Sequence, residues 1–448
     1  MCPTSPTKSK SELVIIVESG RCSHGRCIFC SFSKKPEVMP PDFERLKKDL
    51  DSKLTHHYDI VKYFNSGSFL DKNQMPVDFQ KYLISRCIEY GVSELIIECL
   101  PLHITEGNLS VIKEACSGKN LKVCFALGLE VADDAVLKKI CKGFKMSDYL
   151  KSVSLLKKEG FLVRTYLMAN LPFVGDISES LGNSVRFALE HSDSVAIINA
   201  YAYGYAPLFD MWMKEKWRPL SKKEFDALVK KYYTHKKIDI YFDDYISYPR
   251  FSHQEVLKGA TVENLINPAY IVWQDYIDRF YEVPKEKKYA LFLPCAFRKP
   301  YSTSKTHREI MRRLVPLPFY AALHQVMISN PGVIPREFEG KYPFAHYDWP
   351  EWEETPAIKR KYIEVTQKRV EDYLSNHHYT KVFSYFKPSS ESYVALKNAC
   401  KKLKIDLISC TEESLYSEIS GASEEDAGNV LIERRMLDGL VRCLRKNM

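Results

Sequence analysis

A short apolar run, a loop and a helix-like stretch recur six times between residues 13 and 200, at a period of roughly 30–35 residues that suits a βα unit. The apolar runs are rich in Val, Ile and Leu without strict alternation, which is typical of parallel strands covered on both faces. The pattern predicts an α/β fold, either a partial barrel or an open doubly wound sheet, and both place functional residues at the carboxyl ends of their strands. The predicted strands are 13–17, 60–64, 94–99, 122–127, 162–168 and 194–198, with helices at 43–54, 77–89, 132–142 and 177–190.

The chain length of 448 residues exceeds the size at which one hydrophobic core stops growing, so two domains are expected. The first spans 1–282, and we interpret its aromatic-rich part, 201–282, as a helical and loop extension. The charged segment 283–288 is the predicted linker, and a smaller α/β domain follows at 289–448. Its predicted elements are strands at 289–293, 381–385 and 405–409, helices at 304–314, 356–376 and 389–403, and a helical C-terminal tail at 424–448 with a basic end formed by Arg434, Arg435, Arg442, Arg445 and Lys446.

The composition is that of a soluble protein. Apolar residues make up 45% and charged residues 27% of the chain, and no uninterrupted apolar run approaches the roughly 18 residues of a membrane-spanning helix. The first residues lack the apolar core of a secretory signal, so we expect a cytoplasmic location and no membrane partner. A net charge of +8 is compatible with a polyanionic partner such as RNA.

Three of the thirteen cysteines, Cys22, Cys27 and Cys30, fall within nine residues directly after the first predicted strand, whereas the other ten are scattered. In a reducing cytosol such a group of thiolates selects zinc or an iron-sulfur cluster. A structural zinc site needs a fourth ligand, and only His24 is near. We therefore predict a 4Fe-4S cluster held by three cysteines. Its open iron would bind the amino and carboxylate groups of S-adenosyl-L-methionine (SAM).

The segment Cys22-Ser-His-Gly-Arg-Cys27-Ile-Phe-Cys30 resembles the cluster-binding loop of radical SAM enzymes, most closely that of the branch with an Elongator-type catalytic domain. Four residues separate the first two cysteines, where the commonest family spacing has three. The resemblance implies a partial (βα)6 radical SAM barrel, in which one electron splits SAM into methionine and a 5′-deoxyadenosyl radical. It also implies SAM-binding residues at the ends of the second to sixth strands, namely Asn65, Gly67, Ser68, Glu98, Gly128, Glu130, Asn170 and Asn199.

Lysine, serine, histidine and arginine side chains gather in three C-terminal segments, 293–307, 329–339 and 342–348. These segments lie at predicted strand ends and at a helix start, where donors hold anions or polarise a substrate, while Ser302 or Ser304 is also the expected N-cap of that helix. Together the segments resemble the core domain of archaeosine synthase (ArcS) over residues 285–410. The candidate catalytic residues are Lys299, Lys305, His307 and Arg336.

Both resemblances lead to one pathway. In it, the nitrile of 7-cyano-7-deazaguanine in tRNA receives the side-chain amine of lysine, and a radical SAM partner protein (RaSEA) then cleaves the lysine carbon–nitrogen bond to leave the formamidine of archaeosine. The resemblances therefore imply a radical SAM lyase of tRNA archaeosine biosynthesis, whose ArcS-like domain binds the substrate or contributes to lysine transfer. The implied partners are tRNA carrying the modified deazaguanine, lysine, an external electron donor, and an ArcS or transglycosylase subunit.

Three other functions fit part of the sequence. Methylthiolation of tRNA usually needs a second three-cysteine cluster, and the remaining ten cysteines do not form one. Elongator-like acetyl transfer needs a glycine-rich acyl-CoA loop, which the second predicted domain lacks. In a noncatalytic assembly protein, the cluster would be structural and the C-terminal domain would dock an ArcS subunit.

Overall fold

The computed structural model describes residues 10–242, 248–422 and 430–448. They belong to two compact units, Met1–Arg250 and Phe251–Met448, each with its own main sheet. The division falls earlier than the predicted linker at 283–288, because helix α10 (Pro268–Arg279) packs within the second unit. Its Gln274 accepts a hydrogen bond from Val333 N (3.1 Å) and donates one to Val333 O (3.2 Å).

The first unit contains a seven-stranded parallel sheet, in which each strand pairs with the strands before and after it in the sequence. This unbroken order is that of a partial barrel, whereas a doubly wound sheet reverses its order at a switch point. The partial-barrel prediction and the six predicted strands are confirmed. The strands are β1 (Glu12–Ile16), β2 (Ile60–Phe64), β3 (Glu94–Cys99), β4 (Lys122–Glu130), β5 (Leu162–Ala169), β6 (Ser194–Asn199) and β7 (Ile238–Tyr241).

Strand β7 corrects the interpretation of residues 201–282 as helices and loops alone, and it makes the strands seven rather than six. A run of only four residues carries little strand signal by itself. Polar side chains join it to other strands of the sheet. Arg164 of β5 binds Asp239 of β7 (Nη2 to Oδ2, 2.6 Å) and donates to the Tyr241 hydroxyl (3.3 Å), and Lys62 of β2 donates to the same hydroxyl (3.1 Å).

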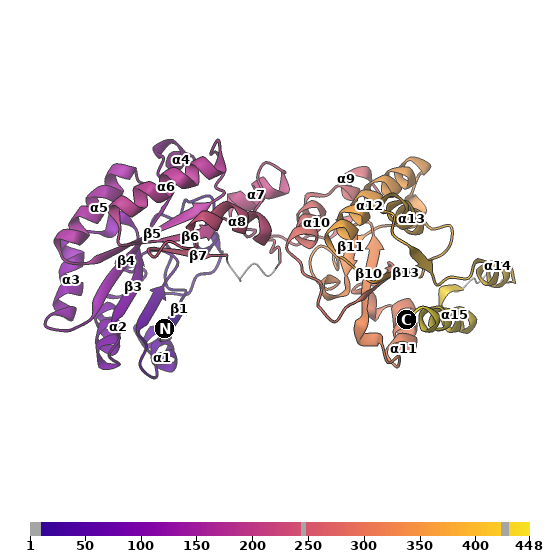
Figure 1. Ribbon diagram of the computed structural model, residues 1–448, viewed down its shortest axis with the longest axis horizontal. Helices are drawn as coiled ribbons and strands as arrows, with labels where there is room; N and C mark the ends of the chain where they lie inside the picture. Colours follow the sequence, from indigo (N-terminus) through magenta and orange to yellow (C-terminus); the bar gives the residue numbers. More distant parts are fainter. Residues whose placement is uncertain (1–9, 243–247, 423–429) are drawn as a thin grey trace, which may run out of the picture. The chain divides into compact units, whose positions relative to one another are not determined.

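Helices cover the outer face of this sheet (Figure 1). Buried strand residues pack against them; the ring of Tyr63 in β2, for example, lies 5.6 Å from that of Phe79 in α2. The predicted helix 132–142 is shorter in the structure, where Cys141 adopts a left-handed conformation (φ 56°) just beyond the helix end. The helices are α1 (Phe43–Lys53), α2 (Val77–Glu89), α3 (Glu106–Cys116), α4 (Asp134–Lys139), α5 (Met146–Lys158), α6 (Ile177–His191), α7 (Pro207–Met213) and α8 (Lys222–Val229).

The second unit is built on a five-stranded sheet with the order β11-β10-β9-β13-β14. All neighbouring pairs are parallel except β10 and β11, which form an antiparallel hairpin. The strands are β9 (Tyr289–Pro294), β10 (Leu323–Ser329), β11 (Gly332–Pro335), β13 (Lys381–Ser384) and β14 (Leu407–Ser409), and β8 (Leu257–Lys258) pairs separately with β12 (Tyr347–Asp348). Besides α10, the helices are α9 (Val262–Leu265), α11 (Lys305–Leu314), α12 (Pro356–Asn376), α13 (Glu391–Leu403), α14 (Glu413–Ala422) and α15 (Arg434–Asn447).

The strands and helices predicted for this region are present, but β10 and β11 were not predicted. Strand β10 is buried at all seven positions. Two of them are the polar residues His324 and Gln325, which interrupt the apolar run by which a buried strand is recognised in a sequence. Helix α15 confirms a helical, basic end, while residues 423–429 of the predicted tail lie outside the described residues. None of the described helices is both long and apolar enough to cross a membrane.

Candidate functional site

The three cysteines of the predicted cluster lie on the loop between β1 and α1, at the carboxyl edge of the first sheet. Cys27 is buried, and Cys22 and Cys30 are half-buried. The segment after α4 holds this loop in place. Ile28 N donates to Ile140 O (3.1 Å), and His24 Nε2 is hydrogen-bonded to Cys141 O (2.7 Å), so the one nearby histidine serves to anchor the loop.

Burial and one lysine control the charge at Cys27. Burial raises the pKa of the Cys27 thiol to about 11, the Lys142 ammonium lowers it, and the neighbouring thiols of Cys30 and Cys22 raise it. A thiolate here therefore requires compensating positive charge, which a metal centre supplies. In the described part of the chain, no three His, Cys, Asp or Glu side chains are grouped to hold a metal ion. The three thiols nevertheless lie on one loop and interact electrostatically, and thiolates are the ligands that iron-sulfur clusters use.

Lys142 is a functional candidate that the sequence did not reveal. It forms a buried ion pair with Glu130 (Nζ to Oε1, 2.5 Å). Burial disfavours the ammonium, but the Glu130 carboxylate and the Cys27 thiol raise the pKa of Lys142 above its ordinary value. Strand β4 bulges after Gly128, where an added Cβ would lie only 2.4 Å from Glu130 Oε1. Gly128 thus makes room for the carboxylate that keeps a positive charge beside the thiols.

The loop after β2 is organised by Glu98 at the end of β3. Its Oε1 accepts hydrogen bonds from the backbone N–H groups of Asn65 (2.6 Å) and Gly67 (3.2 Å). Burial raises the pKa of Glu98 to about 7, although these N–H groups lower it. A Cβ at Gly67 would lie 2.2 Å from Gln74 Oε1, which itself accepts from Ser68 N (2.9 Å). The predicted residues Asn65, Gly67, Ser68 and Glu98 are therefore brought together in one ordered turn.

Four buried carboxylate or amide oxygens at the carboxyl edge of this sheet have no hydrogen-bond partner among the described residues. They are Asn65 Oδ1 and Asp71 Oδ2 beyond β2, Glu130 Oε2 at the end of β4 and Asn199 Oδ1 at the end of β6. A buried acceptor without a donor costs about 1–3 kcal/mol, so such atoms are the ones that a bound ligand satisfies. The polar chemistry of the edge therefore fits a cofactor that carries N–H or O–H donors, as SAM does.

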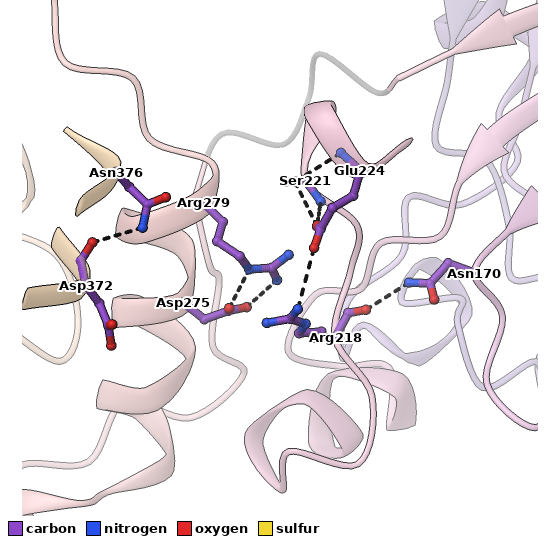
Figure 2. A network of polar contacts seen from close by, with 8 residues as sticks. All are labelled: Asn170, Arg218, Ser221, Glu224, Asp275, Arg279, Asp372 and Asn376. Carbon is purple, nitrogen blue, oxygen red and sulfur yellow. Dashed lines mark hydrogen bonds and ion pairs between the residues drawn. The ribbon is translucent and has the colours of Figure 1, made fainter. Parts of the chain in front are cut away.

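The segment before α8 holds the predicted residues at the ends of β5 and β6. Asn170 Nδ2 donates to Arg218 O (2.8 Å), and Asn199 Nδ2 donates to Leu220 O (2.8 Å). Figure 2 shows Asn170 beside Arg218, whose guanidinium lies 3.5 Å from the Glu224 carboxylate. Glu224 in turn accepts from Ser221, the N-cap of α8. The amide nitrogens of both asparagines are thus hydrogen-bonded, and the role of the segment before α8 is not visible in the sequence pattern.

A second polar group lies at the carboxyl edge of the second sheet, where Lys299 follows β9. The Lys299 ammonium lies 3.8 Å from the ring centre of Tyr347. The Tyr347 hydroxyl is hydrogen-bonded to Ser329 Oγ (2.5 Å) and to Tyr301 Oη (2.7 Å). Burial lowers the pKa of Lys299, while Cys295 and nearby carboxylates raise it. The structure therefore combines a half-buried lysine whose pKa is lowered by burial with a chain of buried hydroxyls.

The other predicted catalytic residues are placed differently. His307 is fully buried, with Nδ1 accepting from Arg336 Nη2 (2.9 Å) and Nε2 bonded to Pro294 O (2.9 Å). Burial and then the Arg336 charge lower the pKa of His307 to about 3. Arg336 also forms an ion pair with Glu339 (2.9 Å), so the guanidinium that contacts His307 is held in position from a second side. Lys305 is exposed on the first turn of α11, apart from them.

Tyr301, Ser329 and Tyr347 lie in the segments 293–307, 329–339 and 342–348 that the sequence singles out, but they are not among the residues predicted individually. Ser329 ends β10, and its strand-end position would have been a signal had that strand been recognised. Tyr301 stood inside a segment that was singled out, but its hydroxyl partner, Tyr347, lies 46 residues away. Tyr347 also lies in a singled-out segment, 342–348, but the sequence does not show that its hydroxyl meets those of Tyr301 and Ser329.

Comparison with known proteins connects the chain with archaeosine synthase. Residues 271–423 match a family model described as a domain of unknown function, DUF5591. The chain is 33% identical over 133 residues to archaeosine synthase subunit alpha of Thermoplasma acidophilum, a match that covers 29% of this chain and 24% of that protein. It is 29% identical over 164 residues to archaeosine synthase subunit beta of Thermococcus kodakarensis, covering 36% of this chain and 50% of that protein. The matches thus span half or less of these relatives.

Among solved structures, methylornithine synthase matches at 17% identity with a TM-score of 0.41, over 52% of this chain and 64% of that one. The first unit is a parallel partial barrel of seven strands, and the match to the DUF5591 model, residues 271–423, falls in the second unit. The chain is distantly related to the alpha and beta subunits of archaeosine synthase.

Proposed function

We propose that this protein is a radical SAM carbon–nitrogen lyase of tRNA archaeosine formation. It would cleave the lysine carbon–nitrogen bond of a lysine-modified 7-cyano-7-deazaguanine, so that the nitrogen stays on the base as part of the formamidine. The observation that carries this proposal is that a single chain is similar to both the alpha and the beta subunit of archaeosine synthase. The two polar sites on the chain would then serve successive parts of one modification.

In the first unit, Cys22, Cys27 and Cys30 would hold the 4Fe-4S cluster, and the unpartnered oxygens at the strand ends would bind SAM. When bound, these two groups supply the one-electron chemistry that a saturated carbon–nitrogen bond requires, since it offers no handle to an acid, a base or a nucleophile. The chain's own residues order the site. Lys142 offsets the negative charge of the thiolates, and Glu98 holds the turn after β2.

In the second unit, the group around Lys299 would bind the modified base and contribute to lysine transfer. Addition of an amine to a nitrile needs an oriented amine and a proton donor at the developing imine nitrogen. Among the four predicted residues, Lys299 fits the donor best because burial lowers the pKa of its ammonium. His307 and Arg336 are tied to each other and act as positioning residues.

The test is to incubate the anaerobically reconstituted protein with tRNA that carries 7-cyano-7-deazaguanine, together with lysine, SAM and dithionite, and to weigh the nucleoside products. A mass shift equal to lysine addition, followed by conversion to archaeosine, is the expected result. A lysine adduct that never matures would remove the lyase activity from this chain. An unchanged nucleoside would remove lysine transfer, and supplying tRNA with a preformed adduct would then test the lyase step alone.

A further inference from the structure

The positive charge of the chain is concentrated on two helices of the second unit. Helices α11 and α15 lie side by side (Figure 1), joined by an ion pair between Arg313 and Asp438 (3.2 Å). Nine basic and two acidic residues give these two helices a net charge of +7, whereas the whole chain carries +8. The rest of the chain therefore carries a net charge of +1, so almost all of the excess of positive over negative charge lies on these two helices.

Much of this charge is available to a partner. Five of the nine basic side chains are exposed and form no ion pair with any described residue, and we call them the basic ledge: Lys305, Arg308, Arg442, Arg445 and Lys446. The opposite faces of both helices are buried, through residues such as Ile310 and Leu440. An excess of arginine and lysine on one face of a protein is the electrostatic feature that polyanions recognise.

The ledge begins beside the polar cluster of Lys299, Tyr301, Ser329 and Tyr347, which we call the Lys299 group. Helix α11 starts at Lys305 directly after its N-cap Ser304, only a few residues beyond Lys299 and at the carboxyl edge of the sheet. The segment before α15 is at the same edge, because Leu431 O accepts from the Tyr385 hydroxyl (2.6 Å) just beyond β13. The far end of α15 is at the amino edge, where Lys381 at the start of β13 donates to Asn447 O. Both helices therefore run away from the polar site along one side of the unit.

We propose that the basic ledge binds the phosphate backbone of an RNA whose modified base reaches the Lys299 group. The choice of tRNA as that RNA rests on the proposed function. Seven of the nine basic residues on α11 and α15 are arginines, and the planar guanidinium group matches the geometry of phosphate. A membrane surface fits less well, because neither helix, each described throughout, exposes a large apolar side chain to enter lipid.

The test compares two full-length variants with equal changes of charge. One is Arg442→Glu, Arg445→Glu and Lys446→Glu at the far end of the ledge, away from the Lys299 group. The matched control is Lys397→Glu, Lys401→Glu and Lys404→Glu, which reverses three exposed lysines on and beside α13. Binding to unfractionated tRNA is measured by fluorescence anisotropy over a series of salt concentrations, without SAM. Circular dichroism and thermal melting verify that both variants are folded.

The ledge variant is expected to bind tRNA about tenfold or more weakly at low salt. The slope of the logarithm of its association constant against the logarithm of the salt concentration should be shallower by about two to three, because three phosphate contacts are lost. The control should stay within about twofold of the wild type, as surface substitutions usually do. Equal losses in the two variants, or unchanged binding in the ledge variant, would overturn the proposal. So would tighter binding of the wild-type protein to polyaspartate or to phosphatidylglycerol vesicles than to tRNA.

The outcome is independent of catalysis. If the ledge variant loses tRNA binding but the wild-type protein converts no nucleoside, the ledge stands and the proposed function fails. If the wild-type protein makes archaeosine while the ledge variant binds tRNA as well as the control, the ledge fails and the proposed function stands. With both intact, the ledge variant should show a raised KM for tRNA and an unchanged kcat.

Discussion

The candidate sites of the two units differ in how their buried oxygen acceptors and ring nitrogens are partnered. At the carboxyl edge of the first sheet, oxygens of Asn65, Glu130 and Asn199 lack donors among the described residues. At the corresponding edge of the second sheet, the ring nitrogens of His307 and the hydroxyl of Tyr347 are engaged by neighbouring groups, and the atoms there without a described partner are Arg336 Nε and Ser384 Oγ. Unsatisfied acceptors describe a site completed by a bound group, whereas satisfied ones describe a site formed by the protein itself.

We infer from this difference that the reactive groups of the two units have different sources. The first unit would depend on its cofactors for chemistry, and its residues would mainly hold them. The second unit would supply its own reactive group, Lys299, in a rigid surrounding. Substitutions in the first unit should therefore act through cofactor content, and substitutions in the second through rates or folding stability.

The largest effect is expected from Cys27→Ala. Removing a thiolate from the loop should abolish both the visible charge-transfer absorbance of the reconstituted cluster and the formation of 5′-deoxyadenosine, while the second unit stays folded. The control is Cys116→Ala, which removes a half-buried thiol from α3 and should change both readings by less than about twofold. Iron content equal to wild type in Cys27→Ala would contradict the assignment of the ligand.

The second effect concerns Lys299→Met, which keeps the apolar stem against Tyr347 and removes the ammonium. Loss of a positioned proton donor should slow formation of the lysine adduct by about 100-fold or more, without changing the iron content. Lys305→Met should leave kcat within about twofold and raise only the KM for tRNA, since Lys305 is exposed. Similar kcat losses in both variants would show that Lys299 has no special role.

The rate should also depend on pH through Lys299. Because the ammonium is the proposed donor and burial lowers its pKa from the ordinary 10.5, adduct formation should fall as pH rises through a value below 10.5. Lys299→Arg, which stays protonated, should move this limb to higher pH. A pH–rate profile of adduct formation measured under saturating lysine tests this, and an unshifted limb in the arginine variant would assign it to another group.

The third effect is on stability. His307 stays neutral when folded, with a pKa of about 3 against an ordinary 6.5, so protons bind to the unfolded chain first as pH falls between these values. The free energy of unfolding should therefore decrease as pH drops from 6.5 towards 3, by about 1.4 kcal/mol per pH unit from this residue. His307→Gln removes the titrating group, and urea unfolding at several pH values should show a shallower decline. Parallel declines would contradict the assignment.

The smallest effect is expected from Tyr347→Phe. It removes one hydroxyl from the chain with Ser329 and Tyr301 and keeps the ring against Lys299. Losing such hydrogen bonds costs about 1 kcal/mol, so adduct formation should slow by about fivefold. Single-turnover kinetics measure this. A loss as large as that of Lys299→Met would mean that the hydroxyl, rather than the ammonium, donates the proton.

The sequence predicted the first unit better than the second for a physical reason. Parallel strands repeat a local pattern, and residues just beyond each strand must meet at one edge. The resemblance to radical SAM enzymes could therefore be mapped onto strand ends, where the structure places Asn65, Glu98 and Asn199. Lys142 was not found, because only the bulge of β4 and the left-handed turn at Cys141 bring it to Glu130. In the second unit, β10 carries polar residues at buried positions, which concealed the strand and with it Ser329.

The central claim is that this chain breaks a carbon–nitrogen bond with a radical generated from SAM. The most direct test supplies tRNA with a preformed lysine-modified deazaguanine as the sole substrate, and quantifies 5′-deoxyadenosine and archaeosine in the same anaerobic reaction. The account predicts that both products form together in the wild-type protein and that neither forms in Cys27→Ala. Archaeosine without 5′-deoxyadenosine, or 5′-deoxyadenosine while the lysine adduct stays intact, would contradict it.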